Sequence, residues 1–235
     1  VQNQGRQSVN HSRAALCLLK KTLDNTAFNT LASNLLEELP PMRLILASSS
    51  PYRRALLERL RLPFEVIAPD IDETPLENED PVALALRLAK EKAMTIAADN
   101  PVAGIIGSDQ VATLQGDAIG KPGDHGRAIE QLKMLSGQTV TFHTALCVAH
   151  NGREETENVV TNCRFRTLSE AEIHYYLDQD KPYDTAGSAK AESLGISLME
   201  HVRSDDPTAI IGLPLITLSS MLRRFNINPL QPDWP

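Results

Sequence analysis

From residue 42 onward, short apolar runs typical of buried strands alternate with segments whose apolar residues repeat at helical spacing. This alternation restricts the fold more than any other feature, because strands and helices that alternate along a chain are typical of α/β proteins. In the first such unit, the run 44–46 precedes Ser50 as a helix N-cap and Pro51 in a first helical turn. A longer helix is predicted after Asp80, before a second apolar strand at 104–107.

The second half of the chain adds hairpin signals to this pattern. Two strand-like runs are joined by Asn151 and Gly152, a strong type I′ turn signal. Ser169 and Glu172 have the spacing of a capping box at the start of another helix. Hairpin and crossover signals together predict a mixed sheet within one α/β domain over residues 42–235.

Residues 1–41 differ in composition from the rest of the chain. They are rich in Asn, Gln, Ser and Thr and end in Pro40 and Pro41, directly before the first strand-like run. They do not show a charged region, a long apolar core and a cleavage site in the order of a secretory signal. We therefore expect an N-terminal extension that is disordered or loosely attached, with a targeting or docking segment as the alternative.

Composition excludes several classes of protein. The chain has 235 residues, 42% of them hydrophobic, and no apolar run approaches the roughly 20 residues needed to span a bilayer. The net charge of -7 argues against a broad basic surface for nucleic acid, although a few Arg and Lys residues in a cleft can still bind a polyanion. Cys17, Cys147 and Cys163 form no CxxC pair, so we expect buried or inert thiols in a reducing cytosol.

The segment 46–54 is a candidate phosphate site. It combines a predicted helix start with the hydroxyl groups of Ser48 and Ser50 and the guanidinium groups of Arg53 and Arg54. Backbone N–H groups at a helix start bind anions, and arginine adds charge-assisted hydrogen bonds. The alternative is that Ser50 only caps the helix and that both arginines are solvated.

Carboxylates in two other places are candidate ligands for a divalent metal. Glu73 lies in the acidic loop 70–75, and Asp109 is expected at the carboxyl end of the strand 104–107. Mg²⁺ typically takes one or two protein carboxylates while substrate phosphates complete its shell. Asp109 is also placed to activate water, whereas an acidic loop by itself is more often solvated surface.

Three lysines are candidates for contacts with the phosphates. Lys121 lies between Gly and Pro in a turn whose backbone can aim the ammonium group. Lys90 and Lys92 lie on the predicted long helix, where salt bridges with Glu91 are the alternative. The chain has neither H-E-x-x-H spacing nor a G-x-S-x-G motif, so we assign no zinc site and no serine hydrolase.

Eight short motifs occur in order along the chain: Leu-Ala-Ser-Ser-Ser-Pro-Tyr-Arg-Arg at 46–54, Asp-Glu-Thr-Pro at 72–75, Ala-Lys-Glu-Lys-Ala at 89–93, Gly-Ser-Asp-Gln at 107–110, Gly-Lys-Pro at 120–122, Lys-Met-Leu-Ser-Gly at 133–137, Ala-Gly-Ser at 186–188 and Gly-Leu-Pro-Leu at 212–215. Each is weak alone, but the ordered set resembles the Maf family of nucleoside triphosphate pyrophosphatases, from residue 42 to about 230. The resemblance implies one Maf/HAM1-like (ITPase-like) α/β domain, in which helices flank a twisted mixed sheet beside a substrate cleft.

The resemblance also implies roles for individual residues. Asp109 matches the family's catalytic proton acceptor, and Glu73 matches a carboxylate that binds metal or orients water. The implied cofactor is a divalent cation, Mg²⁺ or Mn²⁺, held by these two carboxylates. The implied contacts with the triphosphate are Ser48, Ser50, Arg53, Arg54, Lys92 and Lys121, of which Lys121 is also counted as catalytic.

Within the family, three positions resemble the YceF branch, which hydrolyses 7-methyl-GTP to the nucleoside monophosphate and pyrophosphate. They are Tyr52, Gln110 and Glu192. Methylation at N7 makes guanine cationic, so an aromatic face and a carboxylate are apt partners for it. Tyr52 stands where the branch is expected to carry Trp, and a surface acid is the alternative interpretation of Glu192.

Two other functions stay open at this stage. One is hydrolysis of dTTP and UTP, which Gln110 and Glu192 disfavour, because the branch acting on those nucleotides tends to carry other residues there. The other is a nucleotide-binding regulator of cell division that inhibits septum formation without essential catalysis. We expect a cytoplasmic protein whose partner is a nucleoside triphosphate, with no nucleic acid and no membrane; the resemblance leaves a homodimer open.

Overall fold

The computed structural model describes residues 42–231, so the predicted extension 1–41 lies outside the described residues and stays a prediction. The strands are β1 (Leu44–Ala47), β2 (Glu65–Ile67), β3 (Gly104–Leu114), β4 (Asp117–Ile119), β5 (Thr139–His150), β6 (Arg153–Phe165) and β7 (Met199–Ser204). The α-helices are α3 (Pro51–Leu57), α4 (Pro81–Asp99), α5 (His125–Leu135), α6 (Glu170–Asp180) and α7 (Leu215–Arg224).

The seven strands form one mixed sheet, which confirms the predicted fold class. Their order is β2-β1-β3-β5-β6-β7, with β4 paired to β3 off this path. Strand β1 runs parallel to β2 and β3, and every other pairing is antiparallel. The parallel part therefore comes from the crossover units near the start of the domain, and the antiparallel part comes from the hairpins that follow.

The predicted local signals form as expected. Ser50 caps α3 and Asp80 caps α4, each through a side chain that accepts backbone N–H groups. Ser169 forms a capping box at the start of α6. Asn151 and Gly152 both have positive φ, 51° and 78°, as a type I′ turn between β5 and β6 requires.

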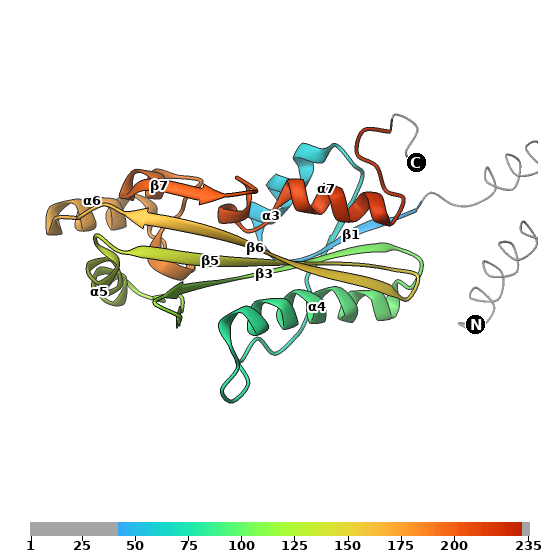
Figure 1. Ribbon diagram of the computed structural model, residues 1–235, viewed down its shortest axis with the longest axis horizontal. Helices are drawn as coiled ribbons and strands as arrows, with labels where there is room; N and C mark the ends of the chain where they lie inside the picture. Colours follow the sequence, from blue (N-terminus) through green and yellow to red (C-terminus); the bar gives the residue numbers. More distant parts are fainter. Residues whose placement is uncertain (1–41, 232–235) are drawn as a thin grey trace, which may run out of the picture. The chain divides into compact units, whose positions relative to one another are not determined.

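Alternate side chains of the central strands enter two different cores. Leu46 and Ile106 belong to the core that α3 and α7 cover, whereas Ile45 and Ile105 belong to the core that α4 covers. Figure 1 shows α4 on one face of the sheet and α3 and α7 on the other. This arrangement follows from the two-residue period of a strand, which sends successive side chains to opposite faces.

A third core lies where α5 and α6 pack against the long hairpin β5–β6. It includes Phe142, Phe165 and Tyr176, which are almost completely buried. Cys147 and Cys163 are buried free thiols, and burial raises the pKa of Cys147 to about 11 and that of Cys163 to about 12. Both are buried, as predicted, while Cys17 lies outside the described residues. Between residues 42 and 231, no helix is both long and apolar enough to cross a membrane.

Strand β3 continues well beyond its predicted end, which corrects the placement of Asp109. The prediction ended the strand at Gly107, but β3 extends to Leu114, so Asp109 lies in its middle. Its pairing with β1 stops at Gly107, because β1 itself ends at Ala47, and beyond that point β3 still pairs with β5. Asp109 therefore lies just beyond the parallel pairing of β3 with β1, while its own strand continues. Strands β4 and β7 were not predicted.

Candidate active site

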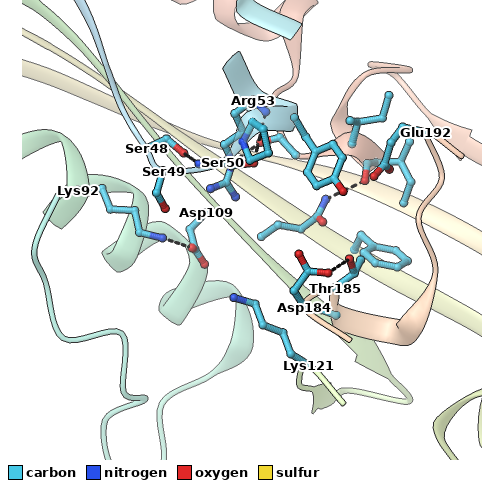
Figure 2. A pocket seen from close by; sticks show the side chains of 18 of the residues that line it. Ser48, Ser49, Ser50, Arg53, Lys92, Asp109, Lys121, Asp184, Thr185 and Glu192 are labelled. Atoms are coloured by element: carbon cyan, nitrogen blue, oxygen red, sulfur yellow. Dashed lines mark hydrogen bonds and ion pairs between the residues drawn. The ribbon is translucent and has the colours of Figure 1, made fainter. Parts of the chain in front are cut away.

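A pocket of about 400 Å³ lies beside the carboxyl end of β1 (Figure 2). Every predicted site residue except Arg54 lines it, so segments from 48 to 192 in the sequence meet around one cavity. The volume falls in the range of small-molecule sites. Figure 2 shows Ser48, Ser49 and Lys92 on one side of the pocket and Asp184 and Glu192 on the other.

Lys92 joins the two predicted catalytic carboxylates. Its Nζ lies 2.6 Å from Oδ1 of Asp109 and 2.7 Å from Oε1 of Glu73. Lys92 and Asp109 are only 6% and 7% exposed. Lys92 lies on α4 in the same buried stripe as Leu88 and Ile96, each four residues away, and that stripe faces the sheet. A charged side chain is costly to bury unless it has a partner of opposite charge, and here Lys92 and Asp109 are partners of each other.

The electrostatics around Glu73 favour its charged form. Partial burial by itself would raise the pKa of Glu73, but the hydrogen bond from Lys92 and the positive charges of Lys92, Lys121 and Arg53 outweigh it, so the pKa lies below its ordinary value. Glu73 is therefore a carboxylate at neutral pH.

A separate ion pair holds the acidic loop on α4. Nε of Arg87 lies 2.7 Å from Oε1 of Glu79, and an Nη2 hydrogen of Arg87 is donated to the carbonyl of Thr74 at 3.1 Å. The Glu79 side chain also accepts the backbone N–H of Leu76 at 2.9 Å. These contacts hold the segment directly after Glu73 against the helix that carries Lys92.

The segment after β1 supplies hydroxyl groups and one guanidinium group to the pocket. The Ser48 hydroxyl accepts the backbone N–H of Ser50 at 3.1 Å, and the Ser50 hydroxyl accepts that of Arg53 at 3.4 Å. Nε of Arg53 donates to the carbonyl of Gly212 at 2.9 Å. Burial lowers the pKa of Arg53, which the charges of Asp109 and Glu73 partly offset, so this guanidinium interacts with both carboxylates.

Arg54 corrects the expectation that four basic residues converge on the pocket. Its side chain is 63% exposed and pairs with Glu58, one turn further along, at 3.1 Å. Neighbouring residues on a helix point about 100° apart, so only one of two consecutive arginines on α3 can face the cleft. In this structure that residue is Arg53.

Two further polar residues of β3 anchor the loop before α7. The Ser108 hydroxyl donates to the carbonyl of Gly212 at 2.9 Å, and Nε2 of Gln110 donates to that of Ala209, also at 2.9 Å. Asp206, 1% exposed, accepts the backbone N–H of Ile216 at the start of α7 at 2.7 Å. The predicted specificity residue Gln110 therefore also positions the wall that carries Gly212.

The far end of the pocket carries an aromatic ring and carboxylates. Tyr52 and Glu192 line it, as predicted from the sequence, together with Asp184. Removal from water raises the pKa of Glu192, although the neighbouring Lys190 acts in the opposite direction. Burial would lower the pKa of Lys190, but Asp184 and a hydrogen bond with Tyr52 outweigh it and raise the pKa.

Several residues that line the pocket were not predicted from the sequence. Phe142 lies in the first half of β5, where its apolar side chain gives the same signal as any core residue. Asp184 and Thr185 directly precede the Ala-Gly-Ser motif, and Gly212 opens the Gly-Leu-Pro-Leu motif. Proximity to these motifs was the available signal for the last three. Lys90, weighed beside Lys92, points away and pairs with Glu154.

The carboxylates of Asp109 and Glu73 are the donors available for a metal ion. The described part of the chain contains no group of three or more His, Cys, Asp or Glu side chains that could hold a metal. Two carboxylates nevertheless fit Mg²⁺ or Mn²⁺, because substrate phosphates and water complete the shell of such ions. Lys92 lies between the two carboxylates and already holds them close together.

Comparison with known proteins adds an independent result to this geometry. The family described as Maf-like protein matches residues 43–225. The chain belongs to the Maf family. The match contains all of the predicted site residues, from Ser48 to Glu192, and so covers the whole pocket.

Relatives within the Maf family are similar over most of their own length. A protein of Bordetella avium named 7-methyl-GTP pyrophosphatase is 64% identical over 189 residues, which cover 80% of this chain and 96% of that protein. A protein of Ralstonia nicotianae with the same name is 59% identical, covering 78% and 95%. The Ham1 protein of Staphylococcus aureus overlaps with a TM-score of 0.40 at 11% identity, covering 53% of this chain and 72% of that one.

Proposed function

We propose that this protein hydrolyses 7-methyl-GTP to 7-methyl-GMP and pyrophosphate. The observation that carries the proposal is the pairing of Lys92 with both Asp109 and Glu73 in a pocket that also contains Arg53 and Lys121. The positive groups suit a triphosphate, and the two carboxylates suit its counter-cation. The names of the Bordetella and Ralstonia relatives support the same substrate.

In the proposed reaction, water attacks the α-phosphorus. The oxygen of water forms a bond to this phosphorus, the bond to the α,β-bridging oxygen breaks, and pyrophosphate leaves. Asp109 accepts the proton of the attacking water, while Lys92 keeps the carboxylate of Asp109 in place. Arg53 and Lys121 neutralise charge that develops on the phosphate oxygens. A divalent cation held by Asp109 and Glu73 would supply further neutralisation of the phosphates.

The opposite end of the pocket is proposed to hold the base. A 7-methylguanine ring is cationic, so the Tyr52 ring can attract it through a cation–π contact. The Glu192 carboxylate can accept hydrogen bonds from the base edge. We also propose that the protein acts on the cytoplasmic nucleotide pool, where modified nucleotides would otherwise accumulate. In this proposal the protein needs neither nucleic acid nor a membrane. Sedimentation would measure whether it forms a homodimer.

A nucleotide panel tests the proposal directly. Purified protein with Mg²⁺ or Mn²⁺ should release pyrophosphate from 7-methyl-GTP faster than from GTP, dTTP or UTP. Asp109→Asn should lose activity by roughly 10²-fold or more with the fold intact by circular dichroism, because it removes the proton acceptor. Asp117→Asn on β4, an exposed position outside the pocket, is the matched control. Equal turnover of dTTP would contradict the substrate assignment, and full activity in Asp109→Asn would contradict the mechanism.

A further inference from the structure

We infer that Asp184 is a further specificity-determining residue, whose carboxylate favours a positively charged base over a neutral one. The inference rests on the proposed function, because 7-methyl-GTP and GTP differ by one methyl group and by one positive charge on the ring. A residue that distinguishes the two through charge must lie at the base end of the pocket and must change the local potential. Asp184 meets both conditions.

The position of Asp184 is set by contacts of the loop that carries it. The loop follows α6, and the carbonyl of Tyr183 accepts the backbone N–H of Gly123 at 2.9 Å. The Tyr183 hydroxyl lies 2.9 Å from Nδ1 of His125 at the start of α5. The loop is therefore joined to the segment after Lys121, and Asp184 lines the pocket on the side of Glu192 (Figure 2).

The charges around Asp184 show how its carboxylate helps to keep the electrostatic potential at the base end of the pocket negative. Nζ of Lys190 lies 3.4 Å from Oδ1 of Asp184, and the Lys190 side chain is only 15% exposed. Asp180 also helps to raise the pKa of Glu192, but it does not line the pocket, and its carboxylate accepts the Ser193 hydroxyl at 2.9 Å and the backbone N–H of Gly195 at 3.2 Å. Asp184 and Glu192 are thus the wall carboxylates that oppose the charge of Lys190.

Removal of the Asp184 charge would leave Lys190 balanced mainly by Glu192. The potential at the base end would then move from negative toward neutral, and a cationic ring would lose attraction while a neutral guanine would not. Because the Asp184 side chain is 71% exposed, water screens its charge, and the expected effect is about two- to fivefold rather than a loss of activity. The effect should also shrink as ionic strength rises.

The experiment compares Asp184→Asn with wild type on two substrates. The ratio of kcat/KM for 7-methyl-GTP to that for GTP should fall about two- to fivefold at low salt, with kcat/KM for GTP unchanged or raised. Asp184→Glu should keep the wild-type ratio, since it keeps the charge. Asp178→Asn, an equal charge change at an exposed position of α6 outside the pocket, should keep it as well.

Binding of the products separates this inference from the proposed function. Calorimetry with 7-methyl-GMP and GMP should show that wild type prefers the methylated nucleotide and that Asp184→Asn reduces this preference. An unchanged preference in Asp184→Asn, or an equal loss for both nucleotides, overturns the inference. A wild-type protein that binds 7-methyl-GMP preferentially but does not cleave 7-methyl-GTP would instead contradict the proposed function and leave the role of Asp184 supported.

Discussion

The Nζ of Lys92 lies 2.6 Å from Oδ1 of Asp109, and both side chains are almost completely buried. The pair connects the middle of α4 to the middle of β3. A buried carboxylate that loses its partner is left with an uncompensated charge, so Lys92 stabilises the fold as well as the site.

Replacement of Lys92 by Met should therefore lower both stability and activity. The substitution retains the apolar part of the side chain but removes the charge, and we expect a loss of about 3 kcal/mol in the free energy of unfolding. Turnover should fall by roughly 10²-fold, since Asp109 and Glu73 lose the group that holds them. Urea unfolding and steady-state kinetics measure the two effects.

Lys90→Met is the matched control on the same helix. Lys90 is half exposed and pairs with Glu154, so its loss should change the free energy of unfolding by less than about 1 kcal/mol and leave turnover unchanged. If Lys90→Met and Lys92→Met behaved alike, the central role of Lys92 would be wrong.

Gly107 sets the distance between α4 and β3. A Cβ atom at this position would lie 2.2 Å from the carbonyl oxygen of Ala89 and 2.9 Å from the backbone nitrogen of Ala93. In Gly107→Ala, α4 must move away from the sheet, which we expect to cost about 1–3 kcal/mol in the free energy of unfolding. Because Lys92 precedes Ala93, kcat should fall too.

The control for this prediction is Gly126→Ala on α5. A Cβ atom there would meet its nearest neighbour, Oδ1 of Asp124, at an ordinary 3.6 Å. Alanine is a better helix residue than glycine, so stability should be unchanged or slightly raised. Thermal unfolding and the pyrophosphate assay compare the two variants, and a wild-type-like Gly107→Ala protein would refute the close-packing argument.

The pair between Glu79 and Arg87 predicts a dependence of stability on pH. The hydrogen bond from Arg87 is the main cause that lowers the pKa of Glu79 to about 2, from an ordinary value of 4.5. A lowered pKa means that the folded state favours the carboxylate. The stabilisation is thus complete above the ordinary pKa and is lost as pH falls from about 4.5 toward 2.

A comparison of Glu79→Gln with wild type measures this dependence. The difference in Tm between the two proteins should be constant from pH 7 to about 5 and should shrink as pH falls below 4.5, because Glu79 is then protonated in the unfolded state before it is protonated in the folded state. Glu77→Gln, the same substitution at an exposed position two residues earlier, is the matched control. A constant difference for Glu79→Gln down to pH 3 would contradict the assigned cause.

The helix caps and the hairpin turn were predictable because each depends on neighbours in the sequence. The Ser50 side chain caps a backbone group three residues away, and the capping box of Ser169 and Glu172 spans the same distance. The left-handed conformation of Asn151 and Gly152 is likewise a property of those residue types. No distant part of the chain is needed for any of these features.

The orientation of basic residues on the helices was only partly predictable. Lys92 could have been chosen over Lys90 from helical phase, because it lies four residues from both Leu88 and Ile96 in the buried stripe. On the shorter helix α3, helical phase alone did not show which of Arg53 and Arg54 faces the pocket. Packing against the loop that carries Gly212 decides that Arg53 faces the pocket.

The α/β class, the helix starts, the β5–β6 hairpin and about half of the residues that line the pocket were predictable from the sequence, because motif order and local periodicity carry that information. The position of Asp109 within a continuing strand was not predictable, since it depends on where β1 ends and on the pairing of β3 with β5, both of which involve distant parts of the chain. The folded structure also shows that Lys92 joins Asp109 to Glu73 and that Asp184 and Glu192 line the same pocket. Such contacts join residues far apart in the chain, and their free energies depend on burial and charge around the folded pocket rather than on any local pattern.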